Sequence, residues 1–209
     1  PVRRRAGQPS WQAVQALHNR QIGGRRIVAA QLPTVFGTSL RRLDTLLDQL
    51  RPELVICVGQ AGGRSAISLE RVAINVDDAP IPDNAGDQPV DTPVAAGAPA
   101  AYFSILPIKA ALAALQREGL PAEVSQTAGT FVCNHVFYGL MHRLASHPGL
   151  SHTRGGFVHV PWLPEQGAPA MALDDVVRGL RTVVRAALSE PAVSARPAAD
   201  RAPRAGTDA

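Results

Sequence analysis

The stretch Leu40-Arg-Arg-Leu-Asp-Thr-Leu-Leu-Asp-Gln-Leu-Arg-Pro-Glu-Leu-Val-Ile-Cys-Val58 places a predicted helix directly before a predicted buried strand. Its leucines recur at the spacing of one helical face, and Pro52 closes the helix. The run from Leu54 to Val58 is short, continuously apolar and bounded by proline and glycine, which is typical of a strand covered on both faces.

The same patterns recur along the chain. Helical spacing predicts further helices over residues 10–19, 107–118 and 171–188, and one that begins near Cys133. Short apolar runs predict strands over residues 27–32, 72–76, 122–126 and 157–160. Strands that alternate with helices predict an α/β fold, a three-layer α/β/α sandwich with a mostly parallel central sheet, whose active site lies at the carboxyl ends of the strands.

Two stretches lack such patterns. Residues 77–106 hold many prolines, glycines and aspartates, which predicts a long loop, and a loop of this length is often functional. Residues 189–209 are rich in alanine, proline and arginine without periodicity, so we expect a disordered tail there. We therefore expect one domain over residues 1–188.

The composition indicates an ordinary globular protein of 209 residues with 45% hydrophobic residues. No apolar stretch reaches the roughly 20 residues of a membrane span, so we expect no membrane association. The net charge is +4, but basic residues are dispersed and aromatic residues make up only 4%, which argues against nucleic-acid binding. Two cysteines and no secretory leader favour a reducing cytoplasm.

Cys133 is the candidate nucleophile. It lies in Thr127-Ala-Gly-Thr-Phe-Val-Cys133-Asn-His-Val-Phe-Tyr-Gly-Leu-Met141, where a turn of small residues leads into an amphipathic helix. A helix start offers free N–H groups and the positive end of the dipole, so we expect the thiol to be shifted toward its thiolate. The alternative is an inert core cysteine, the role we assign to Cys57 within its apolar strand.

A base and a carboxylate complete the catalytic set that covalent acyl transfer requires. Among six histidines, His159 alone lies in an apolar strand that ends at a proline, whereas His135 would point to another face of its helix and take a surface or supporting role. Glu70 could form a surface ion pair with Arg71, but its apolar neighbours at the start of a strand favour a carboxylate that orients the histidine.

A glycine-rich loop and an aspartate-rich loop could indicate phosphate binding and metal binding. The loop Gly59-Gln-Ala-Gly-Gly-Arg64 lacks the glycine spacing and the lysine of phosphate-binding loops, so we expect it to line the active site, with Gln60 as a possible substrate contact. The aspartates of residues 77–91 do not match a calcium loop, and no metal site is expected. Asp83 and Asn84 are expected to form a turn that holds the loop against the site.

These segments, together with Glu70-Arg-Val-Ala-Ile-Asn75 and Ile81-Pro-Asp-Asn84-Ala-Gly86, resemble the pyroglutamyl peptidase I family over roughly residues 7 to 188. The resemblance implies a cytoplasmic cysteine peptidase that removes N-terminal pyroglutamate from peptides without a cofactor, as a homodimer or homotetramer. It places Glu70, Cys133 and His159 on the catalytic positions of the family. The residues implied to bind substrate are Thr34, Gln60, Ile81, Phe131 and Val132.

Two departures from the family qualify this expectation. The family begins with a strand and a Thr-Gly-Phe-x-Pro-Phe-Gly-Gly loop, whereas this sequence opens Pro-Val-Arg-Arg-Arg-Ala-Gly-Gln, so one strand and half of the substrate pocket are expected to be missing. Pro80 stands where the family usually has arginine. The alternative function is therefore a catalytically impaired remnant, and a more distant one is a nucleoside hydrolase or phosphorylase of similar architecture.

Overall fold

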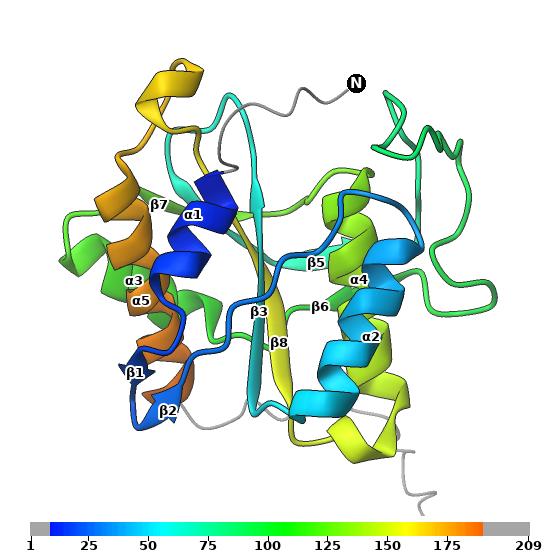
Figure 1. Ribbon diagram of the computed structural model, residues 1–209, viewed down its shortest axis with the longest axis horizontal. Helices are drawn as coiled ribbons and strands as arrows, with labels where there is room; N and C mark the ends of the chain where they lie inside the picture. The colour runs from blue at the N-terminus through cyan, green and yellow to red at the C-terminus, as the bar shows by residue number, and fades with distance from the viewer. Residues whose placement is uncertain (1–8, 190–209) are drawn as a thin grey trace, which may run out of the picture.

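A four-stranded sheet between two layers of helices forms the centre of the protein, as Figure 1 shows for a computed structural model that describes residues 9–189. The strand order is β3-β8-β4-β7, and the strands are β3 (Leu54–Gln60), β8 (Arg154–Val160), β4 (Ile67–Glu70) and β7 (Ala122–Ser125). β3 runs parallel to β8 and β4 runs parallel to β7, whereas β4 runs antiparallel to β8. The predicted α/β sandwich with a mostly parallel sheet is confirmed.

The helices divide between the two faces of the sheet (Figure 1). α1 (Pro9–Ala16), α3 (Ile108–Arg117) and α5 (Leu173–Ser189) cover one face, where they share an apolar core with β4 and β8. α2 (Thr38–Leu50) and α4 (Val132–Ser146) cover the other face. α4 buries the apolar residues that recur at helical spacing along it: Val136, Phe137, Leu140, Met141 and Leu144.

Small elements lie outside the central sheet. β1 (Gln21–Ile22) and β2 (Arg25–Arg26) form a short hairpin, and β5 (Val72–Ile74) pairs with β6 (Ala101–Phe103) next to α4. Two 3₁₀ turns, Pro148–Leu150 and Pro164–Gln166, flank β8. The loop predicted over residues 77–106 is largely irregular, apart from β6 and a bridge between Asp77 and Thr92.

The prediction of a strand over residues 27–32 is wrong, because these residues make no ladder. They run past β3, yet no backbone hydrogen bond joins them to β3 in the described part of the chain. β3 therefore pairs on one side only and is partly exposed. Its two faces do contact the cores, Ile56 and Val58 on one face and Val55 and Cys57 on the other, as its apolar run indicated. An apolar run predicts burial, but a strand also requires a neighbour with free backbone groups in register.

The sequence prediction also missed β4, a fully buried strand of four residues. Glu70 is its last residue, and not the first residue of a strand as expected. Within residues 9–189 no helix is long and apolar enough to cross a membrane. The expected disordered tail lies outside the described residues, apart from Ser189, the last residue of α5.

Candidate active site

The three predicted catalytic residues come from three neighbouring elements of the fold. His159 lies near the end of β8, Glu70 is the last residue of β4, and Cys133 is the second residue of α4. In the sheet, Ser68 of β4 pairs with His159. Strand pairing therefore brings the carboxylate beside the imidazole, although the two residues are far apart in the sequence.

Glu70 and His159 form a buried hydrogen-bonded pair. His159 Nδ1 lies 2.7 Å from Glu70 Oε1, and the two residues are only 4% and 0% exposed. An ionised carboxylate only accepts hydrogen bonds, so Nδ1 carries a proton and donates the hydrogen bond to Glu70. The other ring nitrogen, Nε2, is then unprotonated and available as a base.

Cys133 is on the face of the sheet to which His159 points. Gly59 of β3 is the register partner of His159, and paired residues of adjacent strands point to the same face. A Cβ atom added at Gly59 would lie 2.9 Å from Cys133 Sγ. The sulfur atom therefore occupies the space above Gly59, on the face of the sheet to which His159 points, and the absence of a side chain at Gly59 makes room for it.

The start of α4 provides free N–H groups beside the sulfur atom. Phe131 precedes the helix with extended backbone, and no side chain of the described residues caps it. The amide groups of Val132 and Cys133 belong to the first turn, where a helix has no internal partner for them. This arrangement can bind an oxygen atom that acquires negative charge.

Arg64 contacts the candidate catalytic carboxylate, although the sequence prediction placed it only within a loop. Its Nη1 atom lies 2.7 Å from Glu70 Oε1, and its Nη2 atom donates to the carbonyl oxygen of Thr127 at 3.1 Å. Glu70 Oε1 thus accepts hydrogen bonds from both His159 and Arg64. Arg71, the neighbour considered in the sequence, is not the ion-pair partner of Glu70.

The charged neighbours determine the ionisation of the site. Burial by itself would raise the pKa of Glu70, but hydrogen bonds and charge from His159, together with Arg64, lower this pKa overall, so the carboxylate is ionised. Burial raises the pKa of the Cys133 thiol to about 12; the Glu70 carboxylate adds to the rise and Arg64 opposes it. This direction is opposite to the shift toward the thiolate that the helix start was expected to cause, and burial is its main cause.

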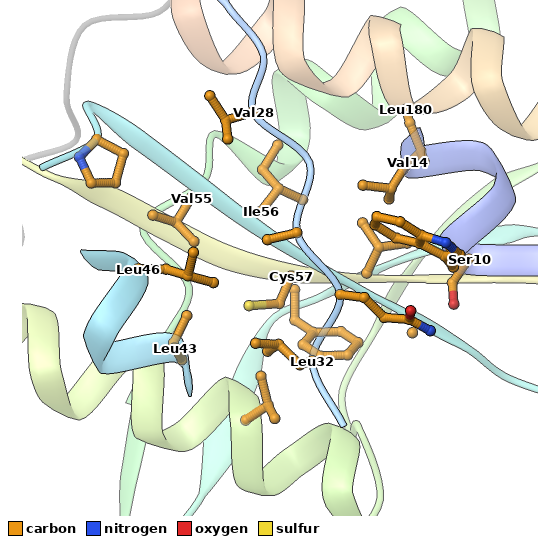
Figure 2. A pocket seen from close by; sticks show the side chains of 18 of the residues that line it. Ser10, Val14, Val28, Leu32, Leu43, Leu46, Val55, Ile56, Cys57 and Leu180 are labelled. Carbon is orange, nitrogen blue, oxygen red and sulfur yellow. The ribbon is translucent and has the colours of Figure 1, made fainter. Parts of the chain in front are cut away.

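A cavity of about 690 Å³ extends from Cys133 along the unpaired side of β3. Figure 2 shows its apolar part, where Leu43 and Leu46 of α2 and Val55 and Cys57 of β3 point toward the space that residues 27–34 run across. Four of the five predicted substrate-binding residues line it: Thr34, Gln60, Phe131 and Val132. The fifth, Ile81, is 49% exposed and does not line this cavity.

Residues distant in sequence fix the walls of this cavity. Gln60 Nε2 donates to Gln166 Oε1 at 2.7 Å, a contact between residues 106 positions apart that was not predicted. Asp83 accepts hydrogen bonds from the amides of Phe36, Ala85 and Asp87. The predicted turn at Asp83 and Asn84 therefore does hold the loop, and the Asn84 amide donates to the carbonyl oxygen of Thr34.

Within the described residues, no three His, Cys, Asp or Glu side chains cluster as metal ligands. Cys57 and Cys133 are both free thiols. Burial raises the pKa of Cys57 to about 12 as well. Of the two thiols, only Cys133 lies at the start of a helix.

Comparison with known proteins gives one consistent result. The profile of the family described as pyroglutamyl peptidase matches residues 1–190. A pyrrolidone-carboxylate peptidase of Cupriavidus taiwanensis is 61% identical over 186 residues, which cover 87% of this chain and 86% of that protein. Pyrrolidone-carboxylate peptidase 1 of Ralstonia nicotianae is 62% identical over 185 residues, which cover 86% of this chain and 85% of that protein.

Solved structures agree with this result. The crystal structure of pyroglutamyl peptidase I from Bacillus amyloliquefaciens superposes with a TM-score of 0.88 at 46% identity and covers 91% of each chain. A mutant pyrrolidone carboxyl peptidase from Pyrococcus furiosus gives a TM-score of 0.86 at 37% identity, with 91% of this chain and 95% of that chain covered.

Proposed function

The chain belongs to the pyroglutamyl peptidase family, and we propose that Cys133, His159 and Glu70 catalyse the hydrolysis it performs, the removal of pyroglutamate from the N-terminus of peptides. The enzyme is a cysteine hydrolase of the pyrrolidone-carboxylate peptidase type. The roles of its individual residues follow from the geometry of the site. The observation that carries them is the buried 2.7 Å bond between His159 and Glu70, on the face of the sheet where the sulfur of Cys133 lies over Gly59, the register partner of His159.

Acylation begins with the transfer of a proton. Because the pKa of the thiol is about 12, Cys133 is protonated at rest, and His159 Nε2 takes the proton as Sγ attacks the pyroglutamyl carbonyl carbon. Glu70 stabilises the imidazolium that forms and keeps Nε2 directed toward the sulfur. Arg64 maintains the negative charge of Glu70.

The attack converts the carbonyl oxygen into an oxyanion. The N–H groups of Val132 and Cys133 at the start of α4 bind it, and a donor of this kind commonly contributes about 3 kcal/mol. When the tetrahedral intermediate collapses, the C–N bond breaks and His159 gives its proton to the departing amine. A thioester between Cys133 and the pyroglutamyl group remains.

Deacylation repeats these steps with water. His159 Nε2 removes a proton from water, the resulting hydroxide attacks the thioester carbonyl, and the C–S bond breaks. The sulfur recovers its proton from His159, and pyroglutamic acid leaves. Each cycle thus consumes one water and restores the thiol.

Recognition of pyroglutamate requires a small apolar slot with few polar partners, because the lactam carries no charge. Phe131 and Val132 supply apolar surface beside the sulfur, and Thr34 lines the same cavity. Gln60 donates its amide N–H to Gln166, which leaves its carbonyl oxygen Oε1 as an acceptor for the lactam N–H. We place Ile81 at the rim of the pocket, since its loop is bonded to Thr34 through Asn84.

Release of the fluorophore from a pyroglutamyl-aminomethylcoumarin substrate tests the proposal. We expect hydrolysis by the wild-type protein, loss of hydrolysis in Cys133→Ala, and full retention in a Cys57→Ser variant that differs only in the other thiol. Undiminished turnover in Cys133→Ala would refute the nucleophile. Absence of turnover in well-folded wild-type protein would instead support the impaired remnant.

Compartment, assembly and metal requirement are further parts of the proposal. Two free cysteines, one of them the nucleophile, fit a reducing cytoplasm, and cell fractionation tests this placement. We propose a homodimer or homotetramer, which sedimentation analysis distinguishes from a monomer. Turnover is expected to survive dialysis against EDTA, since the three catalytic roles are filled by side chains.

A further inference from the structure

His135 is a buried histidine that the proposed mechanism does not use. It lies two residues after Cys133 on α4 and is 5% exposed, so a surface role does not apply to it. Its Nδ1 atom lies 2.7 Å from Asp77 Oδ2, and its Nε2 atom accepts a hydrogen bond from the amide of Gly37 at 3.0 Å.

These two bonds define the protonation of the ring. A backbone amide can only donate, so Nε2 of His135 must be the acceptor. The single proton of a neutral imidazole then lies on Nδ1, and Nδ1 donates the hydrogen bond to Asp77. Both nitrogens are therefore occupied, and His135 has no free nitrogen with which to exchange protons with a substrate.

The imidazole joins α4 and the start of α2, two helices that line the cavity, to the long loop. Gly37 directly precedes α2, whereas Asp77 begins the long loop and is held there by backbone bonds to Thr92 in both directions. The next residue, Asp78, exchanges hydrogen bonds with Thr130, just before α4. The His135–Asp77 pair thus fixes the start of α2 against α4 and against the loop.

Two aromatic contacts of Phe36 link His135 to the cavity wall. The Phe36 ring meets His135 edge-on at 5.2 Å and meets Phe131 edge-on at 5.5 Å between ring centroids. Phe131 lines the cavity beside Cys133, and Thr34, two residues before Phe36, lines it as well. The places of both wall residues therefore depend on where Phe36 and Gly37 are held.

We propose that His135, oriented by Asp77, is a positioning residue for substrate recognition that holds the Phe36–Gly37 segment and thereby sets the walls of the pyroglutamyl pocket. This inference rests on the proposed function, since the pocket is the one that Cys133 serves. His135 does not touch the three catalytic side chains through any hydrogen bond of the described structure. Its loss is expected to weaken binding of the acyl group while leaving the chemistry in place.

The test is a comparison of KM with kcat in variants at this pair. For His135→Leu, which removes both hydrogen bonds, we expect KM for the pyroglutamyl substrate to rise about tenfold while kcat stays within about twofold, the signature of lost uniform binding. His135→Gln keeps an acceptor for the Gly37 amide and should give a smaller rise. The matched control is His142→Gln on the same helix, whose ring bonds Tyr102 away from the cavity and whose KM should not change.

Coupling to Asp77 sharpens the test. Asp77→Ala should raise KM as His135→Leu does, and the double variant should be no worse than either single one, because the two residues act as a unit. If the two substitutions raise KM additively, His135 and Asp77 do not act as a unit. An unchanged KM in folded His135→Leu, or a fall in kcat alone, would overturn the positioning role.

An NMR measurement separates this inference from the proposed function. The ¹⁵N shifts of His135 should show a neutral ring with the proton on Nδ1, whether or not the protein hydrolyses the substrate. A proton on Nε2 would overturn the inference even in an active enzyme. Turnover that survives in Cys133→Ala would refute the proposed function and leave the tautomer result standing, and if His135→Leu fails to fold, His135→Gln and the tautomer carry the test.

Discussion

β8 and β3 lie side by side in the sheet, but β8 is a central strand and β3 is an edge strand, and their surroundings differ sharply. Both strands have 7 residues and pair in parallel. Every residue of β8 is buried, and the strand is paired on both sides, by β3 and by β4. β3 is paired only with β8, and on its other side lies the apolar cavity that residues 27–34 cross without bonding to it.

The proposed catalytic base and the proposed substrate wall lie on different strands of this pair. β8 carries His159, whose position is fixed by packing and by the bond to Glu70. β3 carries Gln60 and, at Gly59, the space that Cys133 occupies, so it helps to form the substrate wall. Catalytic groups require positions fixed to within about 0.5 Å, and the strand with two paired neighbours provides them.

The largest expected effect falls on the rigid side of this comparison. Glu70→Gln keeps the shape of the side chain but removes the charge that stabilises the imidazolium of His159, so kcat should fall about a thousandfold. Glu123→Gln on β7, whose carboxylate accepts a hydrogen bond from Ser68, is the matched control and should change kcat little. Comparable losses in both variants would remove the special role of Glu70.

A substitution at Gly59 of β3 should lower activity because the added methyl group displaces the sulfur atom of Cys133. The Cβ atom of Gly59→Ala would lie 2.9 Å from Cys133 Sγ and 2.8 Å from the Phe157 ring, so the sulfur must move and kcat/KM should fall about a hundredfold. Gly156→Ala on β8 is the control, since its Cβ meets Ser104 and Leu106 instead. We expect it to lower the thermal midpoint with a much smaller loss of activity, and equal losses would contradict the contact.

Arg64 connects the two regions through charge. It lowers the pKa of Glu70 and opposes the rise in the pKa of Cys133, so Arg64→Gln should raise both values. Because ionised Glu70 is the active form, the acid limb of the kcat/KM profile should move to higher pH, and kcat should fall about tenfold. The control Arg178→Gln, which removes an exposed ion pair with Asp175, should change neither the acid limb nor kcat. An unchanged acid limb in Arg64→Gln would argue against the charge effect of Arg64 on Glu70.

The smallest effect concerns the backbone. Amides of β3 that point toward the cavity have no ladder partner, whereas β8 is bonded on both sides. Native-state hydrogen exchange should therefore be about tenfold or more faster for these β3 amides than for β8. Equal protection would show that the free side of β3 is covered in solution.

The sequence predicted the helices well because their signals are local. Leucine spacing and Pro52 determined α2, and α4 and α5 followed the same periodicity to within a few residues. Strands were less predictable. Residues 27–32 have the composition of a strand but form no ladder with another strand, whereas β4 is only four residues long and is defined by pairing with β7 and β8.

The candidate site shows the same division. Glu70, Cys133 and His159 were identified from their motifs, and four of five proposed pocket residues line the cavity. Arg64 and Gln166 were not assigned roles, and His135 was expected only in a surface or supporting role, because the partners of all three come close only through folding. His135 in particular is bonded to Gly37, 98 residues away in the sequence.

By itself the sequence determined the residue types, the helical periodicity and the family to which the chain belongs, since these depend on side-chain chemistry and short-range order. Only the tertiary structure decided the state of the thiol: the helix start favours ionisation locally, but burial and the Glu70 carboxylate raise the pKa of Cys133 to about 12. Ionisation energies depend on solvent exclusion and on charges brought close by folding, which no spacing along the chain encodes.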